Sequence, residues 1–230
     1  FITKEMPSED CDDRFISLRH RFNHSQLLRG TLPPKELRRW VDIQRTSPKS
    51  SGRLVISGKE TAEGTDLGHV HQKIAEVKPD FVVIDGAYLF YPKSISKSGS
   101  DVQRFQYISN HLKRLAKLHR IVLVSIIQGN REGEKKGDAP TNTTLANIYG
   151  ADAWAQDADY ALILNGVRGL PDNRTLEVAK GRESGLGSAR LLFRVDPPTF
   201  TETFNVAAPS SNVPAPNSPD NSATSNLVPI

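Results

Sequence analysis

A short apolar run that ends in a carboxylate constrains the fold of this 230-residue chain more than any other segment. Phe81–Asp85 reads Phe-Val-Val-Ile-Asp, and Gly86 follows it. Four consecutive apolar residues of this kind are typical of a strand that is covered on both faces in a parallel α/β sheet. Because ligands of such sheets bind beyond the carboxyl ends of the strands, the run predicts a site at Asp85.

Asp85 itself has two interpretations at this stage. A carboxylate at the end of a buried strand commonly holds Mg²⁺ against nucleotide phosphates. The alternative is a structural Asp that caps the following turn. The run alone does not choose between them.

The segments around this run alternate between strand and helix patterns. Arg53–Ser57 reads as a strand, and Asp66–Val77 carries apolar residues at helical spacing. Strand, helix and strand in this order form a βαβ unit, which favours parallel pairing. Similar patterns predict a helix capped by Ser8, helices over 34–44 and 101–118, a helical piece at 145–149, and strands over 121–127, 160–164, 176–179 and 190–195.

Composition narrows the class of protein. A single cysteine, Cys11, excludes an internal disulfide framework and any multi-cysteine zinc site, which favours a reducing, cytoplasmic compartment. No apolar stretch approaches the roughly 20 residues that a membrane helix needs, so no membrane association is expected. The net charge of +4 permits a polyanionic partner without requiring one.

The end of the chain differs from the rest. From Asn205 onward it is rich in Pro, Ser, Asn and Ala and has almost no charge, which cannot offset the entropy of ordering. We therefore expect one folded domain over residues 1–204 and a disordered tail over 205–230.

Six segments follow the order found in one known family. They are Phe1–Met6, Lys78–Asp85, Ile108–Lys117, Gln128–Arg131, Gly150–Asp159 and Val178–Arg182. Together they resemble the C-terminal RecA-like motor domain of DnaB-type replicative DNA helicases, from Phe1 to about Phe200. The resemblance implies an α/β fold, a P-loop NTPase core with a mostly parallel central sheet flanked by helices.

The resemblance also implies the roles of individual residues in hydrolysing ATP. Glu5 would be the base that polarises the attacking water, and Asp85 would hold Mg²⁺, usually through water. Gln128 would contact the γ-phosphate and sense its loss. Lys180 and Arg182 would reach the γ-phosphate held by a neighbouring subunit. Each residue taken alone also fits an ordinary structural or solvated side chain.

If Lys180 and Arg182 act on the nucleotide of a neighbouring subunit, the subunits must contact one another. The resemblance implies that they form a homo-hexameric ring. Its central channel would hold single-stranded DNA, and primase, a loader or other replication proteins would be partners. Two polar loops carry the cations that could follow the DNA phosphates. These cations are Lys93, Lys97, Arg131, Lys135 and Lys136.

The chain departs from the family in one major respect. Residues 1–230 contain no Gly-x-x-x-x-Gly-Lys-Ser/Thr loop, whose backbone amides and lysine cradle nucleotide phosphates. We expect that loop upstream of Phe1. In smaller departures, Gly86 stands where the family commonly has Tyr, Gly181 replaces Gln, and Thr3-Lys4 replaces Ser-Leu.

Three functions therefore compete at the sequence level. The first is a helicase motor that is driven by ATP and moves on single-stranded DNA. The second is a RecA- or KaiC-like ATPase that does not unwind DNA. The third is an ATPase-inactive scaffold subunit that binds DNA.

Overall fold

A three-stranded parallel sheet carries the run that ends at Asp85. The computed structural model describes residues 1–46, 52–60, 66–92, 100–128, 151–167 and 169–203. The strands are β1 (Ile2–Thr3), β2 (Phe81–Asp85) and β3 (Val122–Ile126), in the order β1-β2-β3. Their register aligns Thr3 with Asp85 and Asp85 with Ile126. All three strands therefore end at one edge of the sheet.

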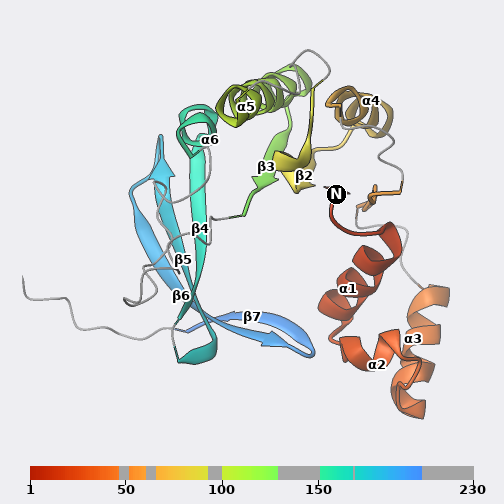
Figure 1. Ribbon diagram of the computed structural model, residues 1–230. Helices are drawn as coiled ribbons and strands as arrows, with labels where there is room; N and C mark the ends of the chain where they lie inside the picture. Colours follow the sequence, from red (N-terminus) through yellow and green to blue (C-terminus); the bar gives the residue numbers. More distant parts are fainter. Residues whose placement is uncertain (47–51, 61–65, 93–99, 129–150, 168, 204–230) are drawn as a thin grey trace, which may run out of the picture.

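Two helices, α4 (Gly68–Val77) and α5 (Asp101–His119), cover this sheet, and they lie above β2 and β3 in Figure 1. Val82 and Ile84 point into the core beneath the helices, while Phe81 is 56% exposed. The expectation of a strand buried on both faces is therefore wrong for β2 within the described structure, because its two faces alternate between packed and open. The core side chains on the helices are Val70, Ile74, Phe105, Ile108, Leu112 and Leu115.

A second sheet follows the short helix α6 (Ala151–Asp157), which packs on α5. Its strands are β4 (Tyr160–Val167), β5 (Leu170–Gly181), β6 (Gly187–Val195) and β7 (Pro198–Glu202), paired antiparallel in that order. The predicted parallel sheet is thus confirmed in β1–β3, although β1 and not Arg53–Ser57 pairs with β2. The strands β4–β7 form a separate antiparallel meander (Figure 1). The sequence analysis did not anticipate this second sheet.

Three helices follow β1 along the chain, before α4: α1 (Ser8–His20), α2 (His24–Leu28) and α3 (Pro34–Thr46). Ser8 begins α1 but is not its cap, since Pro7 occupies that position without a side-chain hydrogen bond. Asn23 does cap α2, because its side chain accepts a hydrogen bond from the Gln26 amide. No described helix is both long and apolar enough to span a bilayer.

Two predicted elements have different outcomes. Arg53–Ser57 is not a regular strand, although Ser57 forms a single parallel bridge with Ile2 and so lies beside β1. The predicted helical piece at 145–149 lies outside the described residues, as does the predicted tail. A short 3₁₀ helix, η1 (Ala87–Leu89), follows β2 directly.

Candidate functional site

The parallel register brings three of the predicted site residues to one edge of the first sheet. Asp85 ends β2, and Glu5 follows β1 by two residues, as Gln128 follows β3. The Nε2 amide of Gln128 lies 3.4 Å from Oε1 of Glu5. Glu5, Asp85 and Gln128, far apart in sequence, thus meet where a parallel sheet presents its ligands.

Thr3 connects two of these residues. Its hydroxyl donates to Oδ2 of Asp85 at 2.9 Å and accepts hydrogen bonds from the amides of Glu5 and Met6, at 3.1 and 3.2 Å. The Thr3 side chain is fully buried, so these bonds are shielded from water. One hydroxyl therefore fixes both the Asp85 carboxylate and the turn that carries Glu5.

Gly86 lets Glu5 approach the end of β2. Its φ is +75°, a left-handed conformation that side chains rarely adopt. A Cβ atom at this position would lie 3.1 Å from Cγ of Glu5 and 3.1 Å from Cδ1 of Leu89. The left-handed turn therefore favours the glycine that departs from the family pattern, and any larger residue here would also push Glu5 and Leu89 aside by a few tenths of an ångström.

Tyr88, on η1, supplies a second hydrogen bond to Glu5. Its hydroxyl donates to Oε1 of Glu5 at 2.7 Å, the same oxygen that Gln128 contacts. Burial, the hydrogen bond to Glu5 and the negative charges of Glu5 and Asp85 raise the pKa of Tyr88 to about 12. Tyr88 is therefore a protonated donor at any physiological pH.

The donor set at this edge suits a hard cation held through water. Among the described residues, no group of three or more His, Cys, Asp or Glu side chains could hold a metal ion directly. Two carboxylates and a hydroxyl gather here, and Mg²⁺ prefers oxygen ligands while keeping several of its waters. Asp85 and Glu5 therefore fit Mg²⁺ that is completed by water and phosphate oxygens.

Lys180 and Arg182 lie elsewhere in the same chain, at the carboxyl end of α6. Lys180 donates to the carbonyl of Ala158 at 2.9 Å, and also to the carbonyl of Ala155. Arg182 donates to the carbonyl of Gln156 at 3.0 Å. Cations at a helix carboxyl end satisfy its last carbonyls and oppose its dipole. The structure thus separates these two cations from Glu5 and Asp85.

The two cations differ in how freely they could leave α6. Lys180 is half-buried against its backbone acceptors. The Arg182 side chain is 51% exposed, and its ion pair with Asp159, at 3.6 Å, is long and solvated. Hydrogen bonding and the charge of Lys113 lower the pKa of Asp159, with a smaller effect from Arg182. Arg182 is therefore the more available of the two for another partner.

The five cations predicted to contact DNA lie outside the residues that the structure describes: Lys93, Lys97, Arg131, Lys135 and Lys136. Sequence reasoning also missed two residues that the structure places at the site, Thr3 and Tyr88. The available signals were a hydroxyl residue two positions before the predicted base and a tyrosine three positions after Asp85.

The family model described as "DnaB-like helicase C terminal domain" matches residues 1–202 of this sequence. The chain belongs to this family. The DnaB-like chain is accordingly an ATP-hydrolysing helicase motor domain, as the six ordered segments predicted. A comparison of its sequence with curated proteins gave no match.

Solved structures share the fold of the DnaB-like chain. One structure, which its title describes as an "ATPase Domain", has a TM-score of 0.72 and 20% sequence identity, with 88% of this chain and 74% of that chain covered. One titled "The Structure Of A DnaB-Like Replicative Helicase And Its Interactions With Primase" has a TM-score of 0.70 and 20% identity, with 86% and 50% covered. At this identity the likeness establishes the fold alone.

Proposed function

We propose that Glu5, Asp85 and Gln128 form the hydrolytic side of an ATP site in a ring-shaped replicative helicase that moves on single-stranded DNA and unwinds duplex. The observation that carries the proposal is the convergence of these three side chains at the carboxyl edge of β1–β3 in a chain of the DnaB-like family. ATP and Mg²⁺ are the proposed ligands, with Mg²⁺ supplying a charge that stabilises phosphate oxygens when bound.

Glu5 is the proposed general base. Its Oε1 accepts hydrogen bonds from Tyr88 and Gln128, and Oε2 has no hydrogen-bond donor among the described residues. One oxygen is thus used for orientation, which leaves the other to accept a proton from an attacking water. Asp85, held by Thr3, is the proposed carboxylate for Mg²⁺, with water between them.

Gln128 is the proposed sensor, because it joins the Glu5 carboxylate to the segment that begins at residue 129. That segment contains Arg131, Lys135 and Lys136, and the other basic loop contains Lys93 and Lys97. These side chains are proposed to follow the phosphates of single-stranded DNA without reading its sequence. Loss of the γ-phosphate would then be transmitted to the DNA-contacting segment through the side chain of Gln128.

The proposed assembly is a homo-hexamer in which Arg182, with Lys180 beside it, acts on the nucleotide of the adjacent subunit. A cation supplied in trans agrees with the position of Arg182 at α6, away from Glu5 of its own chain. The proposal needs a phosphate-binding loop, which residues 1–230 do not contain. Primase and a loader are proposed partners, and the cytoplasm the proposed compartment; one structural neighbour is titled for its interactions with primase.

The test is hydrolysis of ATP by the natural full-length protein, with and without single-stranded DNA. Glu5→Gln should lower kcat by at least about a hundredfold while nucleotide binding persists, because only the proton acceptor is lost. Glu177→Gln, an exposed carboxylate on β5, is the matched control and should leave kcat unchanged.

The outcome also separates the competing functions. Hydrolysis that single-stranded DNA stimulates supports the helicase motor. Hydrolysis that DNA does not change would contradict it and favour the ATPase that does not unwind DNA. Binding of DNA without any hydrolysis would point to the scaffold subunit.

A further inference from the structure

We propose that Tyr88 is a positioning residue for the catalytic carboxylate of Glu5, and that Arg104 fixes the turn that carries Tyr88. The proposal rests on the role of Glu5 given above and assigns a function to two residues that the predicted site did not include. Tyr88 acts through Glu5 and not on the nucleotide itself. It therefore governs the rate of hydrolysis more than the affinity for nucleotide.

The first step of the argument is the hydrogen-bond geometry. The hydroxyl of Tyr88 lies 2.7 Å from Oε1 of Glu5, whereas Nε2 of Gln128 lies 3.4 Å from it. The shorter bond, from a neutral donor to a carboxylate, is the stronger constraint on the carboxylate plane. Gln128 can therefore change its contact while Tyr88 still holds Glu5.

The second step concerns the protonation of Tyr88. A phenol that has lost its proton could not donate to Glu5 and would repel it. An ordinary tyrosine phenol, with a pKa of about 10, already keeps its proton at neutral pH, and a carboxylate can only accept. The hydrogen bond thus has one direction at working pH, from Tyr88 to Glu5.

The third step is the support of Tyr88 by Arg104. The Arg104 side chain projects from α5, is only 9% exposed, and forms an ion pair with Asp101 at 2.8 Å. Its Nη1 atom donates to the carbonyl oxygen of Tyr88 and to that of Phe90, the latter at 3.2 Å. Arg104 thus binds the backbone on both sides of Leu89 and ties η1 to a long helix of the core.

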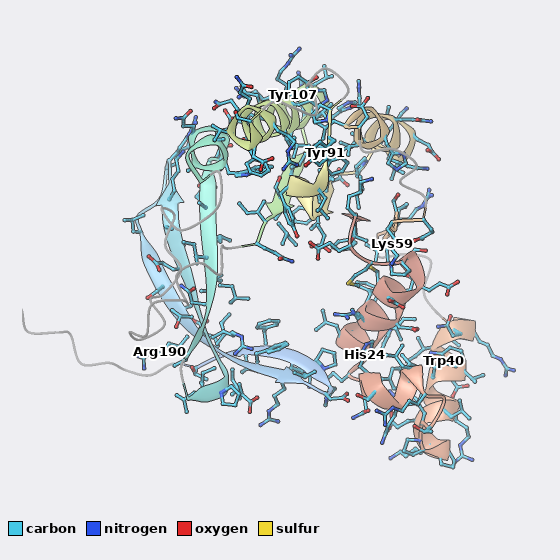
Figure 2. The ribbon with its side chains drawn as sticks, viewed as in Figure 1. His24, Trp40, Lys59, Tyr91, Tyr107 and Arg190 are labelled. Atoms are coloured by element: carbon cyan, nitrogen blue, oxygen red, sulfur yellow. The ribbon has the colours of Figure 1, made fainter. Side chains whose placement is uncertain are left out.

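Aromatic rings hold the guanidinium in place. The Arg104 guanidinium lies 4.1 Å from the centre of the Tyr91 ring and 4.5 Å from that of Phe105. Figure 2 shows Tyr91 below α5, on the side from which β2 emerges. A buried cation with stacking and carbonyl partners has little freedom to rotate. The backbone of η1, which carries Tyr88, is therefore tied to the core through Arg104.

The test uses Tyr88→Phe in the natural full-length protein. The ring and its packing remain and only the hydroxyl is lost, so kcat should fall about tenfold while KM and nucleotide affinity change less than about twofold. Tyr107→Phe, an exposed tyrosine of α5, is the matched control and should not change kcat. An unchanged kcat for Tyr88→Phe would overturn the proposal.

A double-mutant cycle shows whether Tyr88 acts through Glu5. In a Glu5→Gln background, measured in single-turnover assays, Tyr88→Phe should cause no further loss. An equal tenfold loss in both backgrounds would mean a general structural effect and would overturn the proposal. Arg104→Lys should lower kcat in the natural protein and have little added effect with Tyr88→Phe.

Replacing Tyr88 by a fluorinated tyrosine tests the hydrogen bond through the pH dependence of kcat, which a purely structural role of the ring would not change. Ring fluorination makes the phenol more acidic with little change in size. With this residue at position 88, kcat should fall at alkaline pH, where the phenol loses its proton, and the same residue at position 107 should cause no such fall. A pH profile at position 88 that matches the natural one would count against the proposal.

These tests separate this inference from the proposed function. If Glu5→Gln abolishes turnover but Tyr88→Phe does not lower kcat, only the role of Tyr88 fails. If Glu5→Gln retains full turnover, Glu5 is not the base, and both the proposed function and the role of Tyr88 fail.

Discussion

The hydroxyl of Thr3 donates a 2.9 Å hydrogen bond to Oδ2 of Asp85, a residue 82 positions further along the chain. The bond joins the ends of β1 and β2 at the point where Thr3 also accepts from the amides of Glu5 and Met6. A single buried hydroxyl therefore couples the proposed magnesium carboxylate to the turn of the proposed base. The site is built from hydrogen bonds between strand ends as well as from the proposed catalytic side chains.

Thr3→Val should test this coupling. Valine has nearly the same shape but neither donates nor accepts, so Asp85 loses a partner and two amides lose their acceptor. Leaving such buried groups unsatisfied costs about 1–3 kcal/mol of the free energy of unfolding, measurable by chemical denaturation. Thr3→Ser should retain most of the stability. Thr31→Val, on an exposed hydroxyl, should change it by less than about 0.5 kcal/mol. Equal effects of the two valine substitutions would contradict the assigned role.

The titration of Tyr88 provides a prediction that needs no enzyme assay. Its raised pKa of about 12 means that the neutral phenol is favoured in the folded state. This contribution to stability is complete below the ordinary value of 10.0 and is lost as the pH rises from there through about 12. In Glu5→Gln the hydrogen bond to a charged acceptor and the repulsion of phenolate by Glu5 disappear, so the pKa of Tyr88 should fall toward its ordinary value.

Carbon-13 NMR of a label at the phenol carbon of Tyr88 measures this shift directly. At pH 11 the natural protein should retain a mostly protonated Tyr88, and Glu5→Gln should show a larger ionised fraction. Tyr107 provides an internal reference, since it lies on the outer side of α5 and does not contact Glu5. A Tyr88 titration that is identical in both proteins would show that the Glu5 contact is absent in solution.

The candidate site was predictable in part. Asp85 ends a clear apolar run, whereas Glu5 and Gln128 were expected from the family resemblance, and the parallel register places both beside Asp85. Tyr88 was not predictable in this way. Its contact with Glu5 depends on the left-handed Gly86 and on a 3₁₀ turn held by Arg104, and none of these leaves a periodic pattern in the sequence.

The second sheet was less predictable because tertiary pairing extends its strands beyond their local propensity. Only residues 176–179 were expected as a strand in this region, yet β5 covers Leu170–Gly181 and includes Pro171, Asp172 and Asn173. These residues are depleted in strands. Asn173 pairs with Leu192 of β6, and the register between β4 and β5 shifts next to Pro171 and Asp172, an irregularity that tolerates such residues. Arg53–Ser57 is the opposite case. Its composition is typical of a strand, but within the described structure it forms one isolated bridge, between Ser57 and Ile2, and no ladder of paired residues.

Asp196 links this second sheet to the amino-terminal helices. It lies in the turn between β6 and β7, and its carboxylate accepts from the amides of His24 and Ser25, at 2.6 and 3.3 Å, at the start of α2. Figure 2 shows His24 on the side of its helix that faces β7. Burial would raise the pKa of Asp196, but the hydrogen bonds from Ser25 and His24 outweigh it and hold the pKa below its ordinary value.

Asp196→Ala should therefore destabilise the protein by about 1 kcal/mol at neutral pH, because the amides of His24 and Ser25 lose their charged acceptor while Asn23 still caps α2. The lowered pKa means that this contribution is present above the ordinary value of 3.8 and is lost as the pH falls through the folded-state pKa. Denaturation curves of the two proteins should thus converge in acid, and amide exchange at His24 and Ser25 should accelerate at neutral pH. Asp172→Ala, on an exposed carboxylate of β5, is the control.

Replacing the two cations at α6 one at a time should affect the stability of the protein to different degrees. Lys180→Met should lower stability, by roughly 1 kcal/mol, because the carbonyls at the end of α6 lose their donor. Arg182→Ala should leave stability nearly unchanged, because its hydrogen bond to the Gln156 carbonyl is exposed to water and its ion pair with Asp159 is long and solvated. If Arg182→Ala unfolds the protein as readily as Lys180→Met, the distinction between the two fails.

Arg182 should instead affect turnover, and through a neighbouring subunit. Rings of Arg182→Ala subunits should lose most hydrolysis, while Arg190→Ala, on an exposed arginine of β6, should not. Mixing Arg182→Ala with Glu5→Gln subunits should restore activity, because some interfaces then combine an intact Glu5 from one subunit with an intact Arg182 from the next. Mixtures that assemble together yet never exceed the activity of either parent would show that Arg182 does not act across the interface.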